Sequence, residues 1–339
     1  MLDVFKDDAF GVVSLTDAIN KIKFVPGYLG SINLFNGSGV ATTSVALEEV
    51  DGILSLISPS PRGGPGTTLA KAKRALRSVV VPHFEINDAI MAEEVQGVRA
   101  FGQQDAVETV SNKVAERLQV GNQSLNATLE YARVGAVKGI VTYADASTLD
   151  LFGLFGVSQE TEIDFDLDNA SPASGALANK CASVLRLVAK NMAGTGFAGI
   201  DAICGDTFFD QLRAHPEYID TYKNWPDAAQ LRTAYVSGGM TFGSIAFGGI
   251  NFVNYRGFDN SGSPMVDATK CHFYPTGVPN LFRTYYAPAD YIETVNTLGV
   301  PMYAKQYDMP NGKGVHMDTQ MNALNLCTRP KALIKARNT

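Results

Sequence analysis

The chain has 339 residues, of which 45% are hydrophobic and 18% are charged, and its formal net charge is −6. This composition lies far from that of disordered chains, and the length exceeds what one hydrophobic core supports, so we expect two compact lobes or one lobe with long extensions. The negative charge argues against a protein that holds nucleic acid by neutralising its phosphates.

The cysteines and the apolar segments bear on where the protein is found. The four cysteines, Cys181, Cys204, Cys271 and Cys327, lack paired or metal-type spacing, so we interpret them as free thiols of a protein made in a reducing cytoplasm. The first residues are acidic where a secretory signal is basic, and no window approaches the ~20 apolar residues of a membrane-spanning helix. We therefore expect a soluble protein without a membrane partner.

Residues 1–42 are predicted to form an extended arm. They are rich in Gly and Asn and contain one short helical candidate at 15–22. Their scattered large apolar side chains are too many for a solvated tail and too irregular for a domain, and we expect such a stretch hardly to bury itself. The arm should instead lie on a neighbouring molecule, with contacts through Phe24, Tyr28 and Phe35.

Residues 43–82 are predicted to form a long hairpin. Two extended runs, 43–57 and 67–81, flank a tip rich in Pro and Gly. The first run is acidic and the second basic, so opposite charges could pair across the ladder or meet a partner, and DNA binding by the basic run is the alternative. The contacts of the hairpin with other subunits are assigned to Glu48, Glu49, Pro61, Arg62, Gly63, Lys71, Lys73, Arg74 and Arg77.

A long helix is predicted at about 105–133, within a domain that we place at 83–177. Asp105 and Glu108 have the acid-x-x-Glu spacing of a helix N-terminus, and apolar residues follow along one helical stripe. At 1.5 Å per residue the helix would be roughly 45 Å long. Gly121 is a candidate position for a bend.

Shorter elements follow the helix. We expect a strand, turn and strand around 145–147, a strand at 162–168 with an exposed acidic face, and a helix at 172–192 with Pro172 at its first position. A further domain at 178–315 should contain a strand at 200–204, a helix from Asp206 and a sheet region at 240–255. Residues 316–339 should return to the first domain as a late strand.

Motifs for catalysis or metal binding are weak. The glycines at 194–199 follow a helix and lead into a strand, which is the reverse of a dinucleotide-binding turn. The alternating Asp164, Asp166 and Asp168 lack the Gly and Glu of a calcium loop, the four histidines occur singly, and no Ser lies in a nucleophile elbow. We expect no enzyme, no cofactor and no metal, with a soluble enzyme of unknown class as an alternative.

Several segments resemble the phage lambda major head protein family. They are LTDAIN at 15–20, LF at 34–35, SPSPRG at 58–63, VPHF at 81–84, AEEVQG at 92–97, EYARVGAVKGI at 130–140, CGDTFF at 204–209 and RP at 329–330. These segments keep their order over nearly the whole chain. One departure is Ala146, where the family often has Gly after Asp in the turn that follows the helix, so we expect a turn of another type there.

The resemblance implies an α+β major capsid fold of the Hong Kong 97 (HK97) type. In that fold the arm and the extended hairpin would lie on neighbours, the long helix would be the spine of a peripheral domain, and 178–315 would be an axial domain. The subunits would form hexamers and pentamers of an icosahedral shell around double-stranded DNA.

The resemblance also implies partners and a location. We expect a separate scaffolding protein, or a scaffold domain already cleaved away, together with a portal and a decoration protein. Covalent cross-links through Lys71 or Lys73 are a weaker expectation. The protein would be assembled in the host cytoplasm and found in the virion, where DNA is enclosed without sequence-specific contacts. An encapsulin-like nanocompartment shell is the other structural alternative.

Overall fold

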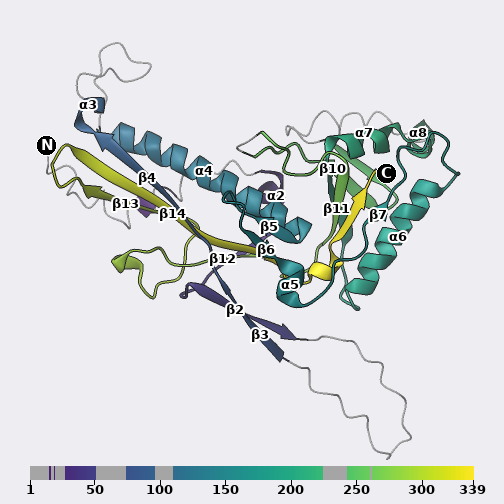
Figure 1. The fold of residues 1–339 in the computed structure, drawn as a ribbon, viewed down its shortest axis with the longest axis horizontal. Coiled ribbons are helices and arrows are strands. Elements are labelled where there is room, and N and C mark those ends of the chain that lie inside the picture. The colour runs from purple at the N-terminus through teal and green to yellow at the C-terminus, as the bar shows by residue number, and fades with distance from the viewer. Residues whose placement is uncertain are drawn as a thin grey trace, which may run out of the picture. The chain divides into compact units, whose positions relative to one another are not determined.

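The computed structural model of the chain describes residues 15–16, 19, 27–50, 74–95, 110–223, 243–259 and 262–339. The chain divides into two compact units, each assembled from segments that are distant in sequence. Both units combine helices with sheets, as the expected α+β class requires (Figure 1). Unit 1 comprises Met1–Val45, Ser78–Glu130 and Arg283–Asn325, and unit 2 comprises Ala46–Arg77, Tyr131–Phe282 and Leu326–Thr339.

Unit 1 contains a five-stranded sheet with the order β1-β12-β14-β13, in which β4 also pairs with β14. Its elements are α2 (Tyr28–Ser31), β1 (Asn36–Gly39), β4 (His83–Met91), α3 (Ala92–Val95), β12 (Phe282–Tyr286), η3 (Ile292–Thr294), β13 (Tyr303–Asp308), β14 (Gly314–Cys327) and the first part of α4 (Val110–Lys138). The long β14 lies antiparallel to both β13 and β4. This is the late strand that the sequence predicts from residue 315.

The long helix α4 packs one apolar stripe into the core of unit 1. Leu118, Leu125 and Leu129 are buried there together with Met317 and Met321 of β14. The stripe is the one that the periodicity predicts, because residues three and four apart share a helix face.

The end of α4 differs from the expected one. The helix continues past residue 133 to Lys138, since Val134 and Val137 are also buried and the chain leaves the helical conformation only at Gly139, whose φ is +87°. The expected first turn, at 105–109, lies outside the described residues. A Cβ on Gly121 would meet Thr319 Oγ1 of β14 at 3.1 Å, so this glycine allows close packing of helix on strand.

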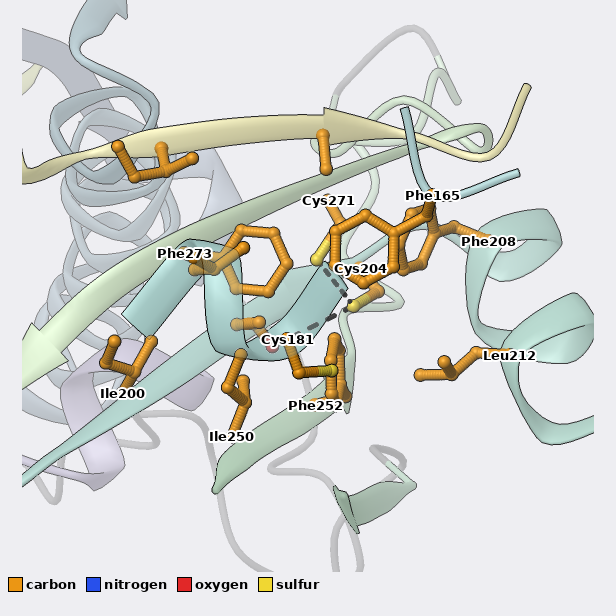
Figure 2. Close-up of a cluster of buried hydrophobic side chains, with 14 of the residues drawn as sticks. Phe165, Cys181, Ile200, Cys204, Phe208, Leu212, Ile250, Phe252, Cys271 and Phe273 are labelled. Atoms are coloured by element: carbon orange, nitrogen blue, oxygen red, sulfur yellow. Dashed lines mark hydrogen bonds between the residues drawn. The ribbon is translucent and has the colours of Figure 1, made fainter. Parts of the chain in front are cut away.

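Unit 2 contains a six-stranded sheet with the order β7-β15-β11-β8-β10-β9. These strands are β7 (Ile163–Asp164), β8 (Gly199–Cys204), β9 (Ser244–Phe247), β10 (Ile250–Asn254), β11 (Lys270–Thr276) and β15 (Ile334–Arg337). The helices of the unit are α5 (Leu151–Phe155), α6 (Ala176–Asn191), α7 (Asp206–Ala214), α8 (Pro216–Lys223) and η4 (Pro330–Ala332). Aromatic and aliphatic side chains of the central strands, α6 and α7 form its buried core (Figure 2).

Two small two-stranded sheets complete the described elements. β5 (Ile140–Thr142) and β6 (Thr148–Asp150) pair antiparallel around the turn at 145–147, which confirms the expected hairpin. In that turn Ala146 has a φ of +63°, and Asp145 accepts hydrogen bonds from the backbone and the hydroxyl of Ser147. β2 (Ser44–Val50) and β3 (Arg74–Val80) form the other sheet, which is the described part of the hairpin predicted at 43–82.

The segment predicted as a strand at 162–168 forms only the two-residue β7. Phe165 and Leu167 are buried while Asp166 and Asp168 are exposed, so the expected alternation is present. The regular strand nevertheless ends, because Asp166 adopts a φ of +53°.

The helix expected at 172–192 begins later, at Ala176, so the placement of Pro172 at its first position is wrong. Gly175, with a φ of +79°, precedes the helix and supplies no side-chain cap. The carboxylate of Glu217 in α8 caps it instead, accepting hydrogen bonds from the amides of Leu177 at 3.0 Å and Ala178 at 3.2 Å.

The arm also differs from the expectation that it hardly buries itself. Among its described residues Leu15, Ile19 and Leu29 are buried within unit 1, and the Nδ2 of Asn122 donates to the carbonyl of Ile19 at 3.0 Å. The carboxylate of Glu130 accepts hydrogen bonds from the first amides of α2. The described part of the arm is therefore anchored to its own chain.

Candidate subunit interface

The hairpin residues that the sequence assigns to intersubunit contacts are only partly within the described chain. Glu48 and Glu49 lie in β2 and Arg74 in β3, whereas Pro61, Arg62, Gly63, Lys71 and Lys73 lie outside the described residues. Arg77, in β3, is half-buried, and its Nη1 donates to the carbonyl of Leu154 within unit 2. The contacts of these hairpin residues with other subunits remain a prediction.

The arm residues assigned to intersubunit contacts are likewise only partly within the described chain. Phe24 lies outside the described residues, Tyr28 is half-buried in α2, and Phe35 is 8% exposed. Because most of the Phe35 ring is already covered by its own chain, it offers little apolar surface to a neighbour. The predicted intersubunit role of these three residues is not tested by their positions in a single chain.

A different surface stands out in the loop between β12 and β13. Ile292, Val295 and Leu298 are 91%, 63% and 69% exposed, which is unusual for three large aliphatic side chains within seven residues. We call these three side chains the apolar knuckle. Their spacing of three residues is the signal that could have identified them within this loop-rich, proline-punctuated stretch.

The backbone beneath the knuckle is well ordered by hydrogen bonds. The buried Thr294 hydroxyl contacts the carbonyls of Ala289 at 2.7 Å and Tyr291 at 3.0 Å. The Thr297 hydroxyl donates to the carbonyl of Thr294 at 2.7 Å, and the amide of Gly299 donates to that of Val40 at 3.0 Å. The backbone of the knuckle is therefore already ordered, so covering it costs mainly the rotamer entropy of the three side chains.

Two charged groups beside the knuckle, Lys305 and Glu293, pair with each other within unit 1. Lys305 Nζ lies 2.8 Å from Glu293 Oε1 and 5.1 Å from the centre of the Tyr291 ring. The hydrogen bond from Lys305 lowers the pKa of Glu293, and burial raises the pKa of Tyr291 above its usual value. The ion pair balances the charges of Glu293 and Lys305 beside the three apolar side chains, and as an exposed pair it contributes little to stability by itself.

Two of the features weighed as catalytic motifs, the glycines at 194–199 and His272, lie in unit 2. α6 ends at Asn191 and β8 begins at Gly199, so the intervening glycines lead from a helix into a strand, as the sequence indicates. Burial lowers the pKa of His272 to about 3, which keeps its imidazole neutral. In the described part of the chain no three His, Cys, Asp or Glu side chains are grouped to hold a metal ion.

None of the helices in the described part of the chain combines the length and the apolar character that a membrane crossing requires.

Comparisons with known proteins match almost the full length of the chain. The family model described as phage major capsid protein E matches residues 11–338. The major capsid protein of Pseudomonas phage KPP10 is 28% identical over 349 residues, covering 97% of this chain and 97% of that protein. The major capsid protein of Salmonella phage Felix O1 (isolate Felix O1-VT1) is 26% identical, covering 99% and 98%.

A solved structure is similar in fold. The crystal structure of a protein assigned as the capsid protein of a prophage (E. coli CFT073) superposes with a TM-score of 0.58, covering 97% of this chain and 99% of that one. The two sequences are 13% identical, so this likeness concerns the fold alone. It agrees with the HK97-type fold expected from the sequence.

Proposed function

Because the chain belongs to the phage major capsid protein E family, we propose that it forms hexamers and pentamers that close into an icosahedral shell around double-stranded phage DNA. Tiling of this kind follows when one heterologous interface is repeated until a ring closes. The HK97-type fold and the family match over residues 11–338 support this role. Such a protein is a structural subunit, and we propose no catalytic activity for it.

The observation that carries the proposal at the level of residues is the apolar knuckle. A lone, soluble subunit would leave Ile292, Val295 and Leu298 in water, whereas a second copy of the chain can cover them. Fully burying one such side chain contributes about 1.5–3 kcal/mol, and a shell repeats each contact in every subunit. We assign the knuckle to the contact between copies, next to paired charges that need no partner.

The hairpin is proposed to add further contacts between subunits. In this arrangement 43–82 extends over a neighbouring subunit, and the described arm residues stay anchored to their own chain. Residues 83–177 and 316–339 are proposed as the peripheral domain and 178–315 as the axial domain. The compact units divide the chain differently, since β12 and β13 belong to unit 1 together with β4 and β14, and β15 pairs with β11 in unit 2.

The proposed partners follow from the same role. A separate scaffolding protein, a portal and a decoration protein would complete the particle, which would be assembled in the host cytoplasm and carried in the virion. With a net charge of −6 the chain is suited to enclose DNA as a wall without a specific binding site.

The test replaces the knuckle. The double variant Ile292→Ser/Leu298→Ser should lose shell formation in analytical ultracentrifugation and electron microscopy and remain as capsomers or single subunits. The matched control, Ile292→Met/Leu298→Met, keeps apolar side chains at the same positions and should form particles. Circular dichroism and the unfolding midpoint of the unassembled subunit should be unchanged in both variants, because the replaced side chains are exposed in the isolated chain.

Two outcomes would count against the proposal. Normal particles from the serine variant would show that the knuckle does not contribute to the contact between copies. A wild-type protein that stays a compact monomer at every concentration would contradict the shell itself.

A further inference from the structure

Two buried cysteines of unit 2 face each other across neighbouring strands. Cys204 is the last residue of β8 and lies directly opposite Cys271 of β11. Their Sγ atoms are 3.0 Å apart, and both residues are fully buried. Figure 2 shows the two sulfur atoms pointing toward one another within the core. The separation is about one ångström longer than a disulfide bond of roughly 2.05 Å.

The strand register allows these sulfur atoms to bond. The carbonyl of Cys204 accepts a hydrogen bond from the amide of Tyr255, on the β10 side, at 2.9 Å. The next pair along the ladder is joined by the amide of Gly205, which donates to the carbonyl of Lys270 at 3.0 Å. The two cysteines therefore form a non-hydrogen-bonded pair, in which Cα atoms lie about 4.5 Å apart, at the short end of the range of about 4.4–6.8 Å that disulfides span.

We propose that Cys204 and Cys271 are an oxidative modification site that forms a reversible disulfide within one subunit when the protein meets a two-electron thiol oxidant. The site concerns the sheet of unit 2 alone, so it does not depend on the proposed shell. Because the Cα separation falls within the range that disulfides span, the bond can close without moving the two strands apart or together, and a thiol reductant can reverse it. The pair would be reduced in the cytoplasm and oxidised outside it.

A diazene such as diamide can oxidise the two thiols to the disulfide. One cysteine thiolate adds to one nitrogen of the N=N bond, which forms an S–N bond. The other nitrogen takes up a proton. The second thiolate then attacks the first sulfur, so the S–S bond forms as the S–N bond breaks, and the leaving nitrogen is protonated. The two thiols lose two electrons and two protons in all, and the diazene becomes a hydrazine.

Burial makes the oxidation slow and selective. Burial, followed by the contact with Cys204, raises the pKa of Cys271 well above its ordinary value, so little thiolate is present at neutral pH. Burial also raises the pKa values of Cys181 and Cys327 to about 12. Neither of these cysteines lies opposite another cysteine in the strand ladders that contain Cys204 and Cys271, so both should remain thiols.

The test counts thiols in the full-length protein. The reduced protein is freed of dithiothreitol, incubated with diamide, denatured and alkylated, and then mapped by mass spectrometry without reduction. We expect two alkylated cysteines in place of four, and a peptide that joins Cys204 to Cys271 and separates again in dithiothreitol. On a non-reducing denaturing gel the chain should stay a monomer, because the bond lies within one subunit.

Matched variants separate this pair from the other thiols. Cys271→Ala should remove the linked peptide, and Cys327→Ala should retain it. Should Cys271→Ala fail to fold, the map of the wild-type protein decides alone. Four free thiols after oxidation, a bond to Cys181 or Cys327, or a ladder of linked subunits would each overturn the proposal.

Discussion

The carboxylate of Glu130 connects the long helix α4 to the N-terminal arm. Its Oε1 accepts a hydrogen bond from the amide of Leu29 at 2.8 Å, and its Oε2 accepts one from Gly30 at 3.1 Å. Glu130 is 5% exposed and Leu29 is fully buried, so water cannot readily replace these bonds. We predict that Glu130→Gln weakens the attachment of α2 to α4.

The expected loss of stabilising free energy follows from the two hydrogen bonds that Glu130 accepts. The glutamine amide retains one acceptor oxygen but places an NH2 group against the other backbone N–H, and the negative charge at the helix N-terminus is lost. A hydrogen bond to a charged group contributes about 1.5–3 kcal/mol, so we expect a loss of about 2 kcal/mol. If α2 opens locally, its amides should exchange about 30-fold faster, because 1.4 kcal/mol corresponds to tenfold.

Hydrogen exchange followed by mass spectrometry of a peptide spanning 27–35 measures this change. The control is Glu116→Gln on the exposed side of the same helix, where the carboxylate contacts Lys113 in solvent and the pKa of Glu116 is lowered mainly by that hydrogen bond. It should leave exchange at α2 unchanged. Equal exchange at 27–35 in Glu130→Gln and wild type, with both proteins folded, would refute this account of the arm.

Two further predictions concern unit 2. Gly139→Ala should destabilise the protein by about 2 kcal/mol or more, because a Cβ at a φ of +87° is strained and would overlap the Phe152 ring, whereas Gly196→Ala, with no atom within 4 Å, should be nearly neutral in chemical denaturation. His272 has a pKa of about 3 in the folded protein against an ordinary 6.5, so its contribution to stability is complete above pH 6.5 and falls by roughly 1.4 kcal/mol per pH unit below it. The denaturation midpoint should therefore fall more steeply from pH 7 to 5 in wild type than in His272→Phe, and parallel curves would contradict this.

Elements whose apolar residues repeat locally were predictable. The stripe of α4, the hairpin around 145–147, the strand at 199–204 and the helix from Asp206 all appear where their periods and turn residues place them. The alternation of Phe165 and Leu167 with acidic residues correctly predicted burial, but not that Asp166 would end the strand. Boundaries failed where a single backbone conformation decided them, as at Gly139 and Gly175.

The candidate interface was less predictable. The hairpin and the arm were assigned from composition and resemblance, and the intersubunit contacts of those residues remain predictions. The knuckle is visible in the sequence only as three apolar residues in a loop. Its exposure depends on local hydrogen bonds of the Thr294 hydroxyl and on the bond between the amide of Gly299 and the carbonyl of Val40, and no local pattern encodes the second contact.

The sequence by itself determined the α+β class, the family resemblance, the long amphipathic helix and the late strand, because local periodicity and ordered motifs carry that information. Only the tertiary structure decided that Glu130 and Glu217 cap helices far from them in sequence, and that Cys204 meets Cys271. Such pairings depend on the register between segments separated by 40 to 101 residues, which packing of the whole core selects.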